Sequence, residues 1–200
     1  MDTSRNVLKA RCDSTGLMIR FIFWAYAIYL VAMTAVGLVL VFRPEGDFSL
    51  SLASGRDGMG GYGFFYGGLM VQFPWNSLTE QAVNAPKLVY LIGYFCGIAV
   101  KICYLGILWQ VARIFKGIDE NSSPFVHAGC RRISRIGILV IASGLIQYGL
   151  QATILGILDL GGGGGNTAWF GILLAGIVII ALSYIFEYGT ALQIESDETL

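Results

Sequence analysis

One charged residue, Lys101, interrupts an otherwise apolar stretch of this sequence and is the first candidate for chemistry. It lies midway between Lys87 and Phe115, inside the apolar run 88–115. If that run crosses a bilayer, Lys101 lies about 21 Å along the helix from its inner end. A charged side chain at that depth is costly, so it should face protein or a water-filled cavity. A lone cation there suits an anionic or polar ligand.

Other polar residues fall at the same depth in neighbouring apolar runs. Ser143, Gln147 and Gln151 are spaced i, i+4 and i+8, so on an α-helix they share one face. Thr34 lies at a matching depth in the first run. The sequence therefore predicts a mid-membrane polar cluster of Lys101, Gln147, Gln151 and Thr34. Hydrogen bonds that merely join helices are the simpler alternative to a ligand or ion site.

A second set of candidate residues lies in the polar segments after the second and fourth apolar runs. Ser123 is a natural N-cap and Pro124 suits a first helical turn, so a helix is expected to begin there. We expect it to follow the membrane surface, with arginines near lipid phosphates, before turning into the membrane at Ile136. The predicted docking face comprises Pro124, Phe125, Arg131, Arg132, Arg135, Glu195 and Asp197.

The patterns that would indicate catalysis or metal binding are missing from the sequence. It contains one histidine, His127, and four cysteines without a CxxC pair. The segment 58–63 matches GxGxxG, but the strand and helix that a dinucleotide site requires do not surround it. We therefore expect no enzyme activity, no cofactor and no metal site.

Four apolar runs must position these residues. The chain is 56% hydrophobic and only 13% charged, which is typical of a membrane protein. The runs are long enough to cross a bilayer as helices and cover about residues 21–42, 88–115, 136–158 and 168–186. The predicted fold is an all-α membrane protein of four transmembrane helices in a single domain, residues 1–200. Its connections are an outer loop (43–87), a cytoplasmic loop (116–135) and a cytoplasmic tail (187–200).

The outer loop carries a strand pattern. Residues 47–53 alternate polar and apolar side chains, and residues 64–66 and 69–73 could supply the partner strand. A small β-hairpin is expected. Ser77 and Glu80 have capping-box spacing and predict a short helix before the second run. Gly93 and Gly97 form a GxxxG pattern that permits close helix packing, with a weaker version at Gly171 and Ala175.

Lysine and arginine residues are unevenly distributed and predict the orientation. Three lie in the outer loop: Arg43, Arg56 and Lys87. Nine lie on the other side: Arg5, Lys9, Arg11, Arg20, Arg113, Lys116, Arg131, Arg132 and Arg135. The positive-inside rule then places both termini in the cytoplasm. The net charge is zero, so nothing favours direct binding to nucleic acid.

The segments at this cytoplasmic side resemble a bacterial family of small four-helix membrane proteins catalogued as a domain of unknown function. The matching residues are Ile114-Phe115, Pro124-Phe125, Ile133-Ser134-Arg135-Ile136-Gly137, Phe186, Gly189, Leu192, Glu195, Asp197 and Thr199-Leu200. Such proteins are often encoded beside a small helix-turn-helix regulator. The resemblance implies a cytoplasmic partner of that kind and a place in the bacterial inner membrane.

Two functions remain open from the sequence. The first is a regulatory or interaction protein that docks a cytoplasmic partner such as a transcription factor. The alternative is a small transporter or channel that uses the mid-membrane polar cluster. Four helices are few for a transporter, so the alternative requires a homo-oligomer. In either case the lipid bilayer surrounds the helices.

Overall fold

Four long helical segments make up most of the chain, and each is long and apolar enough to cross a membrane. The spans are Ser14–Val41, Pro86–Lys116, Gly129–Ile157 and Trp169–Leu192. In this computed structural model they lie in α1 (Asp2–Val41), α3 (Pro86–Asn121), the successive helices α4 (His127–Gly144), η3 (Leu145–Leu150) and α5 (Gln151–Ile157), and α6 (Ala168–Glu198). The four predicted spans are confirmed, and the chain is a multi-pass membrane protein whose apolar helices fit contact with lipid.

The structure describes residues 2–53, 61–74, 78–121, 127–161 and 168–198, and the side chains of residues 14–49, 63–71, 78–116, 129–161, 169–192 and 195. Several helices extend beyond the apolar runs, because hydropathy marks the bilayer core and not the helix ends. α4 is continuous through Ile136, so the predicted surface helix that turns in at that residue is wrong. Long arginine side chains can extend from a spanning helix to the interface, so their charge does not require a separate surface helix. The predicted cap at Ser123 lies outside the described residues.

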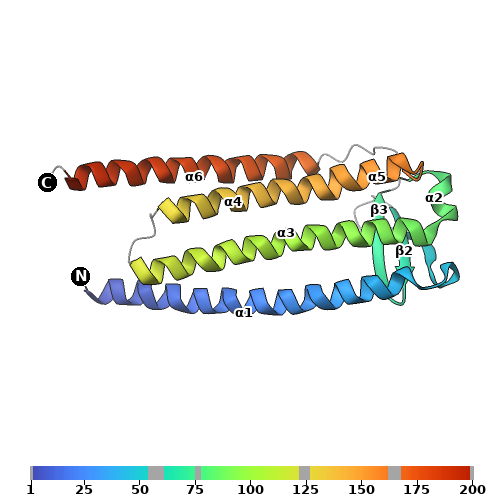
Figure 1. Ribbon diagram of the computed structural model, residues 1–200, viewed down its shortest axis with the longest axis horizontal. Coiled ribbons are helices and arrows are strands. Elements are labelled where there is room, and N and C mark those ends of the chain that lie inside the picture. The colour runs from blue at the N-terminus through green and yellow to red at the C-terminus, as the bar shows by residue number, and fades with distance from the viewer. Residues whose placement is uncertain (1, 54–60, 75–77, 122–126, 162–167, 199–200) are drawn as a thin grey trace. The chain divides into compact units, whose positions relative to one another are not determined.

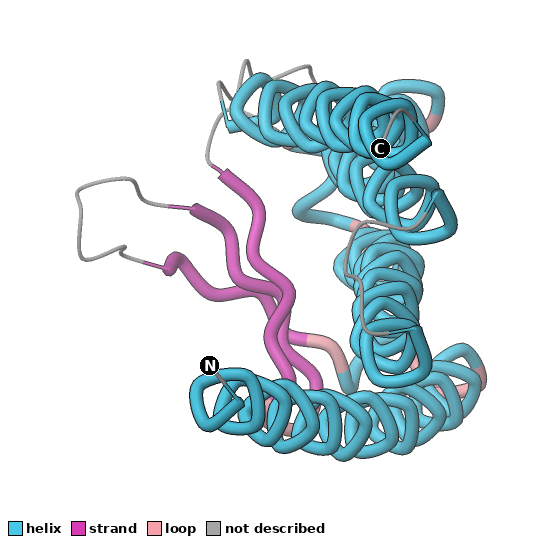
Figure 2. Tube along the Cα trace, turned by 90° about the vertical axis from the view of Figure 1, so that its left-hand side faces the viewer, coloured by secondary structure: helices cyan, strands magenta, loops and turns pink. Residues whose placement is uncertain are grey.

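A three-stranded antiparallel sheet lies in the outer loop (Figure 2). After the short 3-10 helix η1 (Glu45–Asp47), its strands are β1 (Ser49–Ala53), β2 (Gly61–Tyr66) and β3 (Leu69–Pro74), in the order β1-β2-β3. The predicted hairpin is confirmed, and it gains a strand because the expected partner segment is itself a hairpin. Its two-residue turn has φ +50° at Gly67 and +88° at Gly68, and glycine adopts such angles at no steric cost.

The short helix before the second span is present as α2 (Glu80–Asn84), but it begins after Thr79, not at Ser77. The Thr79 side chain does not cap its own helix. Its hydroxyl donates to the Asp159 carbonyl oxygen at 2.7 Å, and its backbone N–H donates to the Leu160 carbonyl oxygen at 3.1 Å. These two bonds join the start of α2 to the chain that follows α5.

Contacts divide the chain into two units. The first comprises residues 1–29, 102–142 and 170–200, and the second comprises residues 30–101 and 143–169. Within the first unit, segments of α1, α3, α4 and α6 run side by side (Figure 1). The Phe23 ring of α1 lies 5.2 Å from the Trp109 ring of α3. A Cβ on Gly106 of α3 would lie 3.1 Å from the Leu139 side chain of α4. These contacts order the helices α1, α3, α4 within that unit.

Helix α4 meets α6 at two glycines of the first unit. A Cβ on Gly137 would lie 2.8 Å from the Gly176 carbonyl oxygen, and a Cβ on Gly176 would lie 2.9 Å from the Gly137 carbonyl oxygen. Only glycine permits backbones this close. The weak motif predicted at Gly171 does not make this contact, because no atom lies within 4 Å of a Cβ built there.

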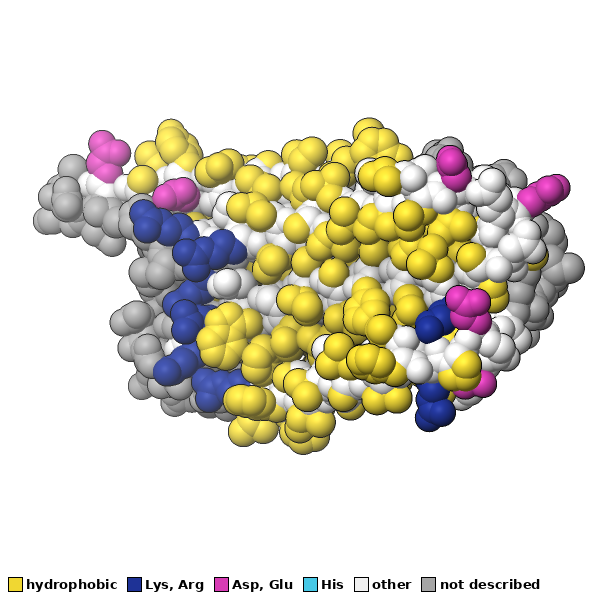
Figure 3. All heavy atoms as spheres, turned by 45° about the vertical axis from the view of Figure 1, so that its right-hand side comes forward, with side chains coloured by type: hydrophobic (Ala, Val, Ile, Leu, Met, Phe, Trp, Pro, Cys, Tyr) yellow, Lys and Arg dark blue, Asp and Glu magenta, His cyan; other side chains and the backbone are white. Residues whose placement is uncertain are grey.

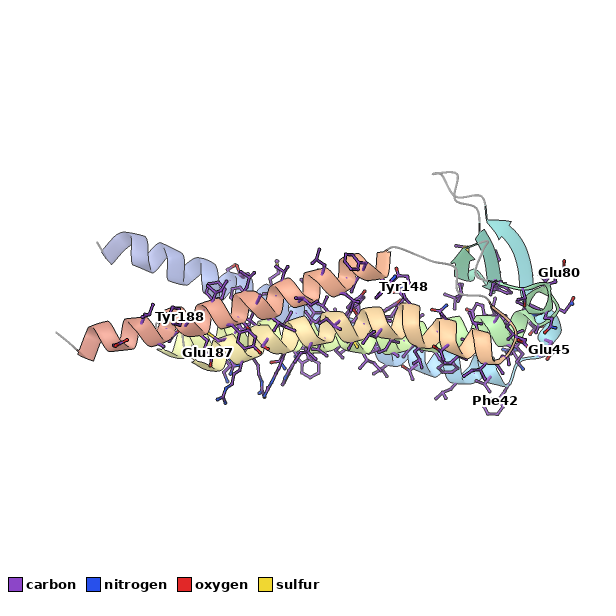
Figure 4. The ribbon with its side chains drawn as sticks, turned by 90° about the horizontal axis from the view of Figure 1, so that it is seen from above. Phe42, Glu45, Glu80, Tyr148, Glu187 and Tyr188 are labelled. Carbon is purple, nitrogen blue, oxygen red and sulfur yellow. The ribbon has the colours of Figure 1, made fainter. Side chains whose placement is uncertain are left out.

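Stacked aromatic rings form the core of the second unit. Phe48 lies 5.1 Å from Tyr66 and 5.3 Å from Tyr90, and Tyr90 stacks on Tyr94 at 5.8 Å. The Tyr94 hydroxyl donates to the Met33 carbonyl oxygen at 2.8 Å, which joins α3 to α1. Phe42, Glu45 and Glu80 all lie at the end of this unit that carries the sheet (Figure 4). The contacts of Phe48 with Tyr66 of β2 and with Tyr90 of α3 anchor the sheet to the helices through aromatic packing.

Candidate functional site

Lys101 lies on α3 in the second unit and is half-buried. Its side chain leans toward the N-terminal end of the helix, as helical side chains do, and passes over Gly97. A Cβ on Gly97 would lie 3.6 Å from the Lys101 ammonium nitrogen, so this glycine leaves room for the ammonium. Among the residues that the structure describes, Lys101 forms no hydrogen bond or ion pair.

The other members of the predicted polar cluster belong to the same unit. The Thr34 hydroxyl donates to the Leu30 carbonyl oxygen of its own helix at 2.8 Å. Gln147 is exposed and Gln151 is half-buried. No hydrogen bond within the described part of the chain connects any two of Lys101, Thr34, Gln147 and Gln151. The structure therefore places the four residues in one unit without bonding them to one another, and a functional cluster stays a prediction.

The segment that carries Ser143, Gln147 and Gln151 is not a regular α-helix, although their predicted common face assumed one. Residues 145–150 form the π-helix η3, and the Gln151 N–H donates to the Ile146 carbonyl oxygen, five residues back. Ser143 is buried at 3% exposure, Gln147 is exposed and Gln151 is half-buried, so the three side chains have different environments. Tyr148 lies on the same segment (Figure 4). π-Turns often occur at functional sites, and this one includes Gln147 and directly precedes Gln151.

The three arginines of the predicted docking face have different environments. Arg131 and Arg135 are exposed, and their i, i+4 spacing places them on one face of α4. Arg132 is half-buried, and its guanidinium donates to the Arg113 carbonyl oxygen of α3. Arg132 thus holds the beginning of α4 against α3, whereas Arg131 and Arg135 present charge to the surroundings.

The predicted tail is the continuation of α6. The helix extends to Glu198 and passes beyond the beginning of α4 within the first unit (Figure 1). Glu195 is exposed on it, and Asp197 belongs to its last turn. Thr190 is buried and donates to the Phe186 carbonyl oxygen at 2.8 Å, so the packed part of the helix includes this residue. Pro124 and Phe125 of the docking face lie outside the described residues.

Sequence reasoning missed two features of α3. The Arg113 guanidinium lies 4.9 Å from the centre of the Trp109 ring, a cation–π contact that their i, i+4 spacing could have indicated. The Gln110 side-chain oxygen is buried and has no hydrogen-bond partner among the described residues.

Figure 3 shows that Lys and Arg side chains gather in a column across the helices, bordered by hydrophobic surface. Arg113 lies beside Arg132 of α4, whose guanidinium donates to its carbonyl oxygen.

The part of the chain that the structure describes contains no cluster of three or more His, Cys, Asp or Glu side chains that could hold a metal ion. Cys96, Cys103 and Cys130 are free thiols. The described polar groups of the candidate sites are guanidinium, ammonium, amide and carboxylate groups, which can bind charged or hydrogen-bonding partners.

Comparison with known proteins identifies a family. The family model described as protein of unknown function (DUF2975) matches residues 74–200. The matched part includes Lys101, both glutamines and every residue of the predicted docking face, whereas Thr34 and most of the sheet precede it. No curated protein and no solved structure matches the chain. Because the match covers more than half of the 200 residues, the chain belongs to the DUF2975 family of proteins of unknown function.

Proposed function

We propose that this protein is a regulatory membrane protein of the bacterial inner membrane that docks a soluble partner on its cytoplasmic side. Both termini lie in the cytoplasm under this proposal, as the distribution of lysine and arginine predicts. The partner class suggested by the family resemblance is a small helix-turn-helix transcription factor. The chain acts by binding and catalyses no reaction.

The observation that carries the proposal is the arrangement of α4 and α6 in the first unit. α6 continues past the beginning of α4, so its acidic last turns extend beyond the helix beside it (Figure 1). Arg131 and Arg135 present two positive charges at the start of α4, and Glu195 is exposed on α6. Complementary charges of both signs give an interface orientation and specificity.

The test is site-specific photo-crosslinking in living cells. A photoreactive phenylalanine analogue at position 195 is expected to crosslink to a soluble protein that mass spectrometry identifies as containing a helix-turn-helix domain. The same analogue at Glu45, an exposed residue of the second unit, is the control and should not capture that protein.

Two variants then locate the contact. Truncation after Leu192 removes the acidic turns but keeps the buried Thr190, and Arg131→Gln with Arg135→Gln removes the exposed charges but keeps the bond of Arg132 to α3. Each is expected to lower capture of the same partner at least severalfold. Crosslinks to lipid alone, or undiminished capture by both variants, would contradict the proposal.

Anion transport is the second candidate function, and the environment of Lys101 supports it. A half-buried ammonium without a hydrogen bond among the described residues is suited to hold an anion in transit. Chloride efflux from vesicles that contain the purified protein tests this idea, with Lys87→Leu as the control near the end of the same span. If the wild type shows no chloride efflux, or if Lys101→Leu shows the same efflux as the wild type, Lys101 has no role in anion transport.

A further inference from the structure

Three arginines from three helices lie at one level of the first unit. α1 and α3 are antiparallel, because Phe23 contacts Trp109 while Gly16 lies beside Phe115. This register places Arg20 within a turn of Arg113. Arg132 lies at the same level, since its guanidinium bonds to the Arg113 carbonyl oxygen. The sequence separates these residues widely, and helix packing aligns them in one layer.

The Arg113 guanidinium is held in place by the Trp109 ring beneath it, at 4.9 Å from the ring centre. The ring contact uses one side of the guanidinium and leaves its N–H groups available for hydrogen bonds. Within the described residues, no hydrogen bond or ion pair engages the guanidinium of Arg113 or of Arg20. Planar guanidinium groups match phosphate geometry and bind it with paired hydrogen bonds.

Among the described carboxylates, Glu187 of α6 lies nearest to the arginine layer along the helix axes. Gly137 lies beside Ile180 in these antiparallel helices, which places Glu187 opposite Cys130, two residues beyond the layer of Arg132. The layer itself therefore carries positive charge from all three of its helices. This distinguishes it from the docking face of the proposed function, which carries basic residues on α4 and acidic residues on α6.

Large exposed apolar side chains lie on the membrane side of the arginine layer. Trp24 on α1 is 65% exposed, Trp109 on α3 is 42% exposed and Ile138 on α4 is 55% exposed. Each lies deeper in its span than the arginine of the same helix. Figure 3 shows the same succession, a column of Lys and Arg beside hydrophobic surface. The surface thus offers a phosphate site and hydrocarbon contact side by side, which a lipid satisfies and a soluble anion does not.

We propose that Arg20, Arg113 and Arg132, with the Trp109 ring, form a binding site for the phosphate of an anionic phospholipid. The lipid belongs to the leaflet at the arginine end of the helices, and its acyl chains lie against Trp24 and Ile138. A phospholipid without a positively charged headgroup is preferred, because the three arginines repel a choline or ethanolamine group. The site is independent of whether a soluble partner docks on Arg131 and Arg135.

The test is lipid retention by the purified full-length protein, measured by native mass spectrometry. Dioleoylphosphatidylglycerol and dioleoylphosphatidylcholine are compared at equal concentration, since they share acyl chains. The wild type should retain the anionic lipid preferentially. Arg113→Gln and Arg20→Gln should each lower that preference about fivefold, as expected for loss of one basic residue at an anionic membrane surface.

Arg43→Gln is a closely matched control. Like Arg113, Arg43 is exposed, and its carbonyl oxygen accepts a bond from a basic side chain, here that of Lys87 at 2.7 Å. It belongs to the second unit, so its replacement should leave the preference unchanged. Arg113→Lys keeps the charge and should restore part of the preference, which separates loss of binding from loss of folding.

Four results would overturn the proposal. They are equal retention of the two lipids by the wild type, an unchanged preference in both glutamine variants, complete displacement of the lipid by inorganic phosphate, and its displacement by an acidic peptide. The third would indicate a site for soluble anions, and the fourth would indicate a protein-docking surface.

Discussion

At the scale of single residues, identical side chains one turn apart have opposite energetic roles. Tyr90 and Tyr94 stack on each other in α3 and are both buried. The Tyr94 hydroxyl donates to the Met33 carbonyl oxygen, whereas the Tyr90 hydroxyl has no partner among the described residues. A buried polar group without a partner costs free energy, while a satisfied one contributes modestly to stability.

The two tyrosines therefore give a paired prediction. Tyr94→Phe should lower the free energy of unfolding by about 1 kcal/mol, because it removes the bond to Met33. Tyr90→Phe should leave it unchanged or raise it by about the same amount. Unfolding of both variants in one detergent, with increasing dodecyl sulfate, measures the difference. An equal loss in the two variants would show that the Tyr90 hydroxyl has a partner beyond the described residues.

The glycines of α6 give a second pair. In Gly176→Ala the new methyl group would lie 2.4 Å from the Ile141 side chain and 2.9 Å from the Gly137 carbonyl oxygen. We expect this variant to be destabilised by about 1–3 kcal/mol. Gly171→Ala in the same helix meets no atom within 4 Å and should be neutral or stabilising by up to about 1 kcal/mol. Thermal unfolding in detergent compares the two, and equal melting temperatures would contradict a close crossing of α4 and α6.

At the scale of elements, the turn between β2 and β3 shows how local chemistry sets the sheet. Gly67 has φ +50°, an angle that asparagine also adopts, while Gly68 has φ +88°, which suits glycine alone. Since β2 lies between β1 and β3, this turn sets the register of the central strand.

Substitutions in the turn should therefore differ in effect. Gly67→Asn should be tolerated, whereas Gly68→Val should destabilise the sheet by about 1–2 kcal/mol. Limited proteolysis of the purified protein reports on the sheet, and faster cleavage within residues 61–74 is expected for Gly68→Val only. If both variants are cleaved at the wild-type rate, the turn does not determine the stability of the sheet.

At the scale of the whole molecule, the orientation of the chain in the membrane determines which side can bind a soluble partner. Alkaline phosphatase fused after Leu200 should be inactive and green fluorescent protein fused there should fluoresce, because the positive-inside bias places the C-terminus in the cytoplasm. Phosphatase inserted within residues 54–60 should be active. Opposite results at both fusion positions would place the proposed docking face on the other side of the membrane.

The spans and the sheet could be predicted because each depends on a local pattern. A bilayer core requires a long apolar run, and a half-exposed strand alternates polar and apolar residues. The contact of Gly137 with Gly176 could not be predicted, because it depends on the register between helices that no local pattern encodes. Hydropathy also placed the end of the fourth span at Phe186, although the helix continues to Glu198.

The candidate sites were predicted less completely for the same reason. Arg131, Arg132 and Arg135 look equivalent in the sequence, and only helix packing shows that Arg132 holds α4 against α3. The regular spacing of Ser143, Gln147 and Gln151 gave no sign of the π-helix between the first and the last of them, because a π-turn has no distinct pattern of residue types. Trp109 and Arg113 offered a usable signal in their spacing, since residues four apart on a helix are neighbours.

The small buried share of the spans has an evolutionary consequence. Between 11 and 33% of the most apolar stretch of each span is buried, so most of its positions remain available for contact with lipid. Hydrocarbon chains discriminate poorly among Leu, Ile, Val and Phe, and selection acts weakly on exchanges between these residues. Homologues should therefore drift rapidly over most of the helix surface and retain identity at a few contacts, such as Tyr94 and Gly176. Divergent members of the family would then share those few positions while the rest of their helices differ.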